Sequence, residues 1–146
     1  MVAILLLLAH LQSAFGAGAG ADELHFQQLL RTPGSLLVYG GEHHNVFLGC
    51  LNCEPSNRDS IDNKNGDHGS PTGEYSIRNR RGKYGDKQFS DFSPCNLSAK
   101  YPPMITDRDG HQYGTLTINW RDPDFRQNAA INHWLTGEVC AGVYKP

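Results

Sequence analysis

The middle of the chain contains a repeat that limits how it can fold. Residues 60–63 read Ser-Ile-Asp-Asn and residues 76–79 read Ser-Ile-Arg-Asn, and glycines follow six and nine residues after each serine. Five positions therefore recur at an offset of 16 residues, and a partial third copy begins at Ser93 after a further 17 residues. Repeats of this kind stack because a single copy cannot bury its apolar face alone. We expect one short strand or turn per copy over about residues 56–98, with Ile61 and Ile77 in the core.

The composition agrees with a fold built from turns. Gly, Pro, Asn, Asp and Ser make up 53 of the 146 residues, or 36%, which excludes a helical bundle or a long coiled coil. The length predicts one domain. A formal net charge of -2 argues against a dedicated nucleic-acid binder, so we expect no nucleic-acid partner.

The N-terminus has the pattern of an export signal. Met1–Ala9 reads MVAILLLLA, an apolar run too short to cross a bilayer. The small residues that follow offer cleavage sites after Gly16, Ala17 or Ala19. No Lys or Arg precedes the apolar run, which departs from the usual pattern. We predict a signal peptide over residues 1–19 and a single globular domain over 20–146. The mature chain would be periplasmic or secreted, without a transmembrane segment.

The four cysteines predict two disulfides in an oxidising compartment. Cys50 and Cys53 would lie about 10 Å apart at Cα in a straight strand, so pairing them needs a turn at Leu51-Asn52. Asn tolerates the conformation that such a turn can require. Of the three possible connectivities we favour Cys50–Cys53 with Cys95–Cys140.

The remaining pattern predicts a small, mainly β (α+β) fold, a turn-rich antiparallel sheet with a short N-terminal helix and one C-terminal helix. The first helix is expected over residues 22–31, and a hairpin around Gly40–His44. Asp107–Gly110 predicts a second hairpin, whose following strand over residues 111–120 would place Leu116, Ile118 and Trp120 on one face. Asp122 and Pro123 begin a helix that ends near Gly137. A final strand is expected over residues 138–144.

One segment order resembles a known family. The chain reads YGGEHHNVFLGCLNC from Tyr39 to Cys53, followed by the two repeat units, Ser93–Asn96, and Tyr113-Gly114 through Asn119. This order is similar to that of small secreted bacterial proteins and domains of unknown function, which carry S-I-W-N-x-x-G-x-Y-G-S units and an S-P-W-N unit. The resemblance covers roughly residues 37–119 and implies an exported location. Asp62, Arg78 and Cys95 stand where those units have Trp, so any ligand bound by the tryptophans is in question here.

A basic stretch in the second repeat unit is the main binding candidate. Residues 78–87 carry five basic side chains against one Asp, a net charge of +4, with Tyr84 among them. Charge combined with ring stacking suits a phosphate, an acidic glycan or another polyanion, while a solvated loop is the plainer interpretation. The predicted contacts are Arg78, Arg80, Arg81, Lys83 and Tyr84, with His68 as a further one.

Catalytic and metal signals are weaker. A His-Glu pair could act as acid and base in hydrolysis, with candidates Glu42, His43, His44, His68 and His111. His44-x5-Cys50-x2-Cys53 suggests zinc, but pairing of the cysteines is the preferred interpretation. Acidic residues between Asp59 and Asp67 suggest calcium, yet the EF-hand spacing fails and Asx-capped turns explain them better. We therefore predict no metal and no cofactor.

These observations favour an exported binding or interaction module. Its ligand would be a cell-wall component, a glycan or another polyanion, and a protein partner is a further possibility. A small secreted hydrolase using the His/Glu residues and a secreted inhibitor or immunity-type protein are the alternatives.

Overall fold

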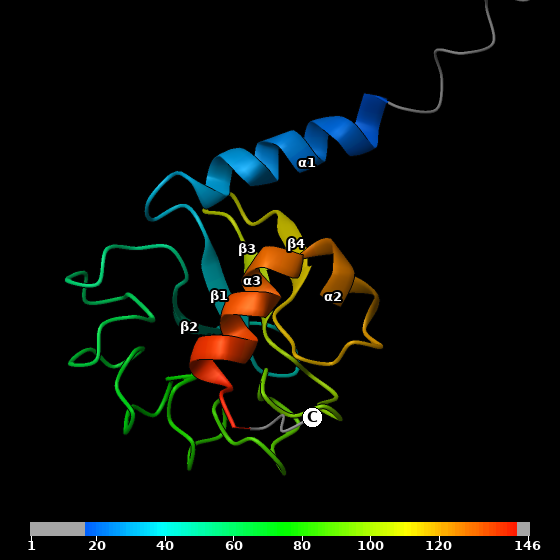
Figure 1. The fold of residues 1–146 in the computed structure, drawn as a ribbon. Coiled ribbons are helices and arrows are strands. Elements are labelled where there is room, and N and C mark those ends of the chain that lie inside the picture. Colours follow the sequence, from blue (N-terminus) through cyan, green and yellow to red (C-terminus); the bar gives the residue numbers. More distant parts are fainter. Residues whose placement is uncertain (1–16, 143–146) are drawn as a thin grey trace, which may run out of the picture.

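The computed structural model describes residues 17–142, and side chains from Glu23 onward. Residues 1–16, most of the predicted signal peptide, lie outside this range. The first helix, α1 (Ala17–Leu30), begins before the predicted position at Asp22. Four short strands then form one antiparallel sheet, and the chain ends in short helical segments (Figure 1). The predicted α+β fold is confirmed.

The sheet is made from the two predicted hairpins. Strands β1 (Leu37–Gly40) and β2 (Val46–Cys50) form the first, and β3 (Met104–Thr106) and β4 (Gln112–Thr115) form the second. The strand order is β2-β1-β3-β4, with β1 paired to β3 at its centre. Because β1 and β3 are antiparallel, the turn after β1 and the turn after β3 lie at opposite ends of the sheet.

The strand predicted over residues 111–120 is shorter than expected. It ends at Thr115, after which the Leu116 N–H donates to Pro103 O and the Ile118 N–H donates to Pro94 O. The first bond extends the pairing with the β3 side by one residue, and the second turns the chain toward Pro94. Leu116 and Ile118 are both buried. Alternation predicts Trp120 on the same face, but Trp120 is 53% exposed, because the chain turns at Asn119 after leaving the sheet.

Residues 54–99, here called the turn segment, are a succession of hydrogen-bonded turns. The N–H groups of Asn57, Ser60, Asn63 and Gly66 each donate to the carbonyl three residues earlier. At Ser70 the bond spans four residues, back to Gly66 O, and three-residue turns then resume. Four steps of three residues and one of four give the 16-residue spacing between Ser60 and Ser76.

Serine and asparagine side chains close these turns in the same way each time. Ser60, Ser76 and Ser93 accept from the backbone N–H two residues on, at 3.1–3.2 Å. The amides of Asn63, Asn79 and Asn96 each donate to the carbonyl six residues back, at 2.9–3.0 Å. Such bonds satisfy the backbone where no sheet partner does.

The core lies between the sheet, the turn segment and the helices, which contribute Phe26, Ile131, Leu135 and Val139. Ile61 and Ile77 are buried as predicted, together with Val38, Leu48 and Ile105 of the strands. Tyr84 and Cys95 of the turn segment are buried in the same core. The turn segment therefore supplies apolar side chains to the core although it forms no strand of the sheet.

The C-terminal helix differs from its prediction in its second half. Asp122 caps α2 (Pro123–Gln127) as expected, but the helix breaks at Asn128, whose amide donates to Tyr113 O. Helix α3 (Ala129–Trp134) continues into a π turn, η1 (Leu135–Val139). The predicted strand over 138–144 is therefore wrong within the described range, because the buried Leu135 and Val139 hold this part in helical form. Residues 143–146 lie outside that range.

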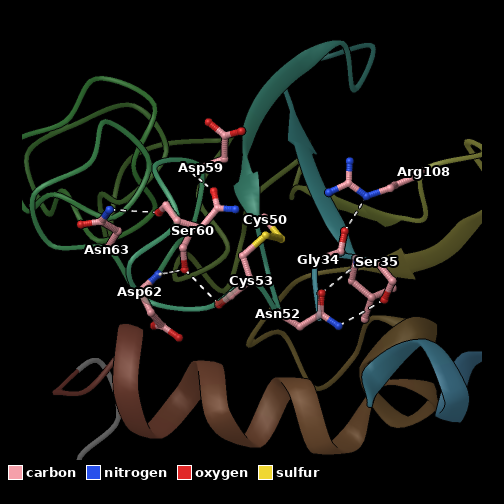
Figure 2. The surroundings of a disulfide bond; sticks show 12 residues. Gly34, Ser35, Cys50, Asn52, Cys53, Asp59, Ser60, Asp62, Asn63 and Arg108 are labelled. Carbon is pink, nitrogen blue, oxygen red and sulfur yellow. Dashed lines mark hydrogen bonds between the residues drawn. A yellow bond between two sulfur atoms is a disulfide. The ribbon is translucent and has the colours of Figure 1, made fainter. Parts of the chain in front are cut away.

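Both predicted disulfides are present. Cys50 and Cys53 are joined across the turn after β2, and Cys95 of the turn segment is joined to Cys140, directly after η1. Asn52 lies in the loop that the Cys50–Cys53 disulfide closes. It accepts from the Leu36 N–H and donates to the Leu29 and Thr32 carbonyls. This loop therefore holds the end of α1 against the start of β1 (Figure 2).

Candidate functional site

Three of the predicted basic contacts, Arg78, Arg80 and Arg81, line one cavity of the turn segment. We call it the basic cavity; its volume is about 600 Å³ and it lies where the turn segment meets η1. The lining includes three guanidinium groups, one amide and one carboxylate. The lining residues are Pro71, Thr72, Arg78, Asn79, Arg80, Arg81, Glu138 and Val139.

Arg78 is held in place by the fold. Its Nε donates to Ile61 O at 2.9 Å, and its Nη2 forms an ion pair with Asp62. Its guanidinium also lies 5.8 Å from the centre of the Trp134 ring. The Arg78 side chain is only 20% exposed. It joins two turns of the segment to α3 and presents a fixed positive charge at the edge of the cavity.

Arg80 and Arg81 have the opposite character. Both are exposed, and neither forms an ion pair within residues 17–142. Burial, followed by repulsion from Arg80, lowers the pKa of the nearby Lys87. Arg80 and Lys87 are therefore close enough to repel each other, and an anion bound between them would relieve that repulsion.

The other two predicted contacts are placed differently. Lys83 is exposed, and its ammonium lies 4.0 Å from the centre of the Phe92 ring and 5.5 Å from that of Tyr84. Tyr84 is only 4% exposed and packs close to Gly40. Burial raises the pKa of Tyr84. Its ring belongs to the core and offers no face to a ligand, which corrects the prediction of a stacking contact there.

The candidate catalytic histidines do not come together. His43 and His44 lie in the turn after β1, whereas His111 lies after β3, at the opposite end of the sheet. His44 Nε2 lies 3.0 Å from Pro102 O, and His43 and Glu42 are exposed. Glu42 interacts instead with Tyr101, whose pKa is raised by a hydrogen bond with the Glu42 carboxylate. His68 packs edge-on against Phe47, with ring centres 4.8 Å apart. No joint His/Glu site forms from these residues.

His111 belongs to a local network around a buried carboxylate. Asp107 accepts from His111 Nδ1 at 2.9 Å and from the Tyr113 hydroxyl at 2.8 Å. Burial raises the pKa of Asp107, but these bonds and the N–H groups of Asp109 and His111 outweigh it and lower the pKa to about 2. The bond to Asp107 in turn raises the pKa of His111.

His111 lines a cavity that contains a candidate general base but no candidate side-chain nucleophile. The cavity has a volume of about 590 Å³, and His111 lines it with Glu23, His25, Phe26, Gln112, Tyr113 and Gln127. An imidazole oriented by a carboxylate has the arrangement of a general base. The lining contains no serine, threonine or cysteine that could act as a nucleophile.

The metal interpretations can be compared with the same geometry. The sulfur atoms of Cys50 and Cys53 are bonded to each other and so are not thiolate ligands. Asp62 pairs with Arg78, and Asn63 accepts from the Asn65 N–H in an Asx turn. The ligand atoms of Asp107, Asp109 and His111 lie within 4.8 Å of one another, but both Asp107 oxygens already accept hydrogen bonds.

A further, smaller cavity, which the sequence did not indicate, adjoins the Cys50–Cys53 disulfide. Its volume is about 240 Å³, and it combines two aromatic rings with polar side chains. The lining residues are Leu37, Tyr39, Phe47, Cys50, Cys53, Asn57, Asp59 and Arg108. We call it the aromatic groove. The alternation of side chains along β1 could have placed Leu37 and Tyr39 on its outward face. Nothing in the sequence pattern relates these two residues to Asp59 or Arg108.

The fold and these sites define a small disulfide-containing α+β module. None of the helices within the described part of the chain is long and apolar enough to span a membrane. No protein-family model, curated protein or solved structure matches the chain.

Proposed function

We propose that this chain is an exported binding module that takes a polyanionic ligand, such as an acidic cell-wall glycan, at the basic cavity. The observation that carries the proposal is the pair Arg80 and Arg81, exposed at the cavity without an acidic partner among the described residues. Arg78 adds a third guanidinium whose position is fixed. Two exposed guanidinium groups next to each other suit a ligand with more than one negative charge.

The arrangement also suggests how the ligand would be held. The Asn79 amide already bonds Gly73 O and the Arg81 N–H, so the guanidinium groups would make the main contacts. Glu138 on η1 also lines the cavity and would repel an anion from that side. The ligand would therefore lie along the turn segment, over Arg80 and Arg81. Lys83 and Lys87 add charge nearby and would strengthen the attraction at low salt.

Three observations support export. The apolar N-terminal run followed by small residues is typical of a signal peptide. Both disulfides suit an oxidising compartment. The segment order resembles that of small secreted bacterial proteins. N-terminal sequencing of protein recovered outside the cytoplasm tests this: we expect it to begin at Ala17, Gly18 or Gly20, whereas a chain that begins at Met1 contradicts export by this signal.

A binding experiment with matched variants tests the ligand class. We expect the wild-type protein to bind immobilised polygalacturonate at low salt, and Arg80→Gln with Arg81→Gln to lower the affinity about tenfold or more. Arg31→Gln with Arg126→Gln makes the same change of net charge at two exposed positions outside the basic cavity and should have little effect. Equal losses in the two double variants would show that net charge alone attracts the polymer and would overturn the proposed site.

A further inference from the structure

The aromatic groove depends on an irregularity in the first hairpin. Leu37 faces Cys50 and Val38 faces Gly49, but Tyr39 faces Phe47, so that Leu48 is passed over. Such a bulge redirects the side chains that follow it. Here it places Tyr39 and Phe47 side by side on the outer face of the hairpin, with ring centres 5.4 Å apart, while Leu48 stays in the core.

The bulge also brings β2 against the turn segment. Gly49 has φ +129°, and a Cβ at this position would lie 2.9 Å from Asp59 O, from Ile61 Cγ1 and from His68 Cβ. The Cys50 N–H donates to Asp59 O at 2.7 Å. Asp59 is therefore fixed at its backbone beside the aromatic pair, while its carboxylate remains 49% exposed.

Polar groups lie on both sides of the groove. Figure 2 shows Asp59 and Arg108 on either side of the Cys50–Cys53 disulfide. Arg108 Nε donates to Gly34 O at 2.6 Å, which orients the guanidinium and leaves its other N–H groups for further bonds. Asn57, the third polar group, accepts from the Asp59 N–H, which orients its amide as well.

This combination describes the chemistry of one class of ligand. A sugar ring has an apolar C–H face, which stacks on aromatic rings, and hydroxyls that both donate and accept. The groove offers the rings of Tyr39 and Phe47, a carboxylate acceptor and guanidinium and amide donors. The lining contains one acidic and one basic side chain, Asp59 and Arg108, and so carries no net charge that would select a charged ligand. The Asp59 carboxylate also lies 3.6 Å from the Arg58 guanidinium, outside the groove. Its volume lies below the roughly 300–1,000 Å³ of cavities for drug-sized ligands, which suits one small ring.

We propose that the aromatic groove binds a single pyranose ring of a neutral saccharide, stacked against Tyr39 and Phe47 and hydrogen-bonded by Asp59 and Arg108. The row of rings continues from Phe47 to His68 and Tyr75, with centres 4.8 and 6.4 Å apart, and would support the next ring of an oligosaccharide. This site shares no residue with the basic cavity, so it stands or falls independently of the proposed function.

Titration of the isotope-labelled protein with chitohexaose, cellohexaose and maltohexaose, followed by NMR, tests the proposal. We expect at least one of these neutral oligosaccharides to shift the resonances of Tyr39, Phe47 and Asp59. Tyr39→Ala should weaken that binding about tenfold. Asp59→Asn, which leaves the backbone bond to Cys50 intact, should weaken it severalfold and keeps the test valid if Tyr39→Ala unfolds.

Two control variants distinguish the aromatic groove from the rest of the protein surface. Phe89→Ala removes a ring that is 84% exposed and lies outside the groove, and Arg80→Gln with Arg81→Gln removes charge from the basic cavity. Both should leave saccharide affinity unchanged. The proposal is overturned if none of the three oligosaccharides shifts groove resonances, or if Asp59→Asn and Tyr39→Ala bind as tightly as the wild type.

Discussion

Arg78 forms an ion pair with Asp62, the residue sixteen positions earlier and the same position of the preceding repeat unit. A polar contact therefore joins the corresponding positions of the two units. The third such position is Cys95, which is joined to Cys140. Figure 2 shows Asp62 pointing toward the C-terminal helical segment, whereas Asp59 points away from it. The three positions thus fasten that segment to the turns.

The ion pair predicts a coupled loss of stability. Arg78→Met leaves the Asp62 carboxylate and the Ile61 carbonyl without their partner and should lower the free energy of unfolding by about 1–3 kcal/mol. Asp62→Asn should cost less, because the Asp62 side chain is 38% exposed. Urea denaturation of both single variants and the double variant measures this. A double variant whose loss equals the sum of the single losses would show that the two side chains are not coupled.

The two disulfides should differ in their contribution. Cys95–Cys140 closes a separation of 45 residues and Cys50–Cys53 one of 3 residues. The loss of chain entropy then predicts about 4 kcal/mol for removing the first pair and about 2 kcal/mol for the second. Paired Cys→Ser variants avoid free thiols, and thermal or urea unfolding ranks them. A larger loss on removing Cys50–Cys53 would contradict this order.

Asn52 predicts a local effect at the end of α1. Asn52→Ala removes the acceptor of the Leu36 N–H and the donor to the Leu29 and Thr32 carbonyls, at a cost of about 2 kcal/mol. Amide hydrogen exchange should rise at Leu36 and around residues 29–35. Asn52→Asp keeps an acceptor for Leu36 and should protect that N–H better than Ala does. Equal exchange at Leu36 in the two variants would exclude the role of the Asn52 oxygen.

The Asp107 network predicts how stability changes with pH. Because the folded-state pKa of Asp107 is about 2, below its ordinary value of 3.8, its contribution of about 2 kcal/mol is present above pH 4 and is lost as the pH falls toward 2. His111 has a raised pKa, so its contribution is complete below pH 6.5 and is lost as the pH rises through the folded-state pKa.

Thermal unfolding from pH 2 to 9 checks both signs. Asp107→Asn should lower the melting temperature at pH 5 and flatten the acid side of the profile. His111→Gln should remove the decline that we expect on the alkaline side. Parallel profiles for the wild type and Asp107→Asn would contradict the lowered pKa of Asp107.

The parts of the fold that sequence predicts well are those fixed by neighbouring residues. The hairpin at Asp107–Gly110 and the cap at Asp122 depend on turn and capping chemistry within a few residues, and the structure confirms both. The break at Asn128 was not predictable in this way, because it follows from a bond to Tyr113 on β4. The predicted final strand failed for the same reason, since burial of Val139 decides its conformation.

The candidate site shows the same division. Arg80 and Arg81, two of the contacts predicted from the charge pattern, are exposed at the basic cavity. The pattern could not tell that Arg78 is paired or that Tyr84 is buried. Both depend on contacts with distant segments, Asp62 for the first and Gly40 for the second. The aromatic groove was missed because it depends on a bulge at Leu48, which alternation of apolar residues does not reveal.

The most direct test of the central claim is the affinity for polygalacturonate of the wild type, the Arg80→Gln/Arg81→Gln variant and the Arg31→Gln/Arg126→Gln variant, measured from low to high salt. We predict that only the Arg80→Gln/Arg81→Gln variant binds about tenfold more weakly than the wild type at low salt. Its affinity should also depend less on salt, because two positive charges no longer contact the polymer. Wild-type affinity and salt dependence in the Arg80→Gln/Arg81→Gln variant would contradict a polyanion site at the basic cavity.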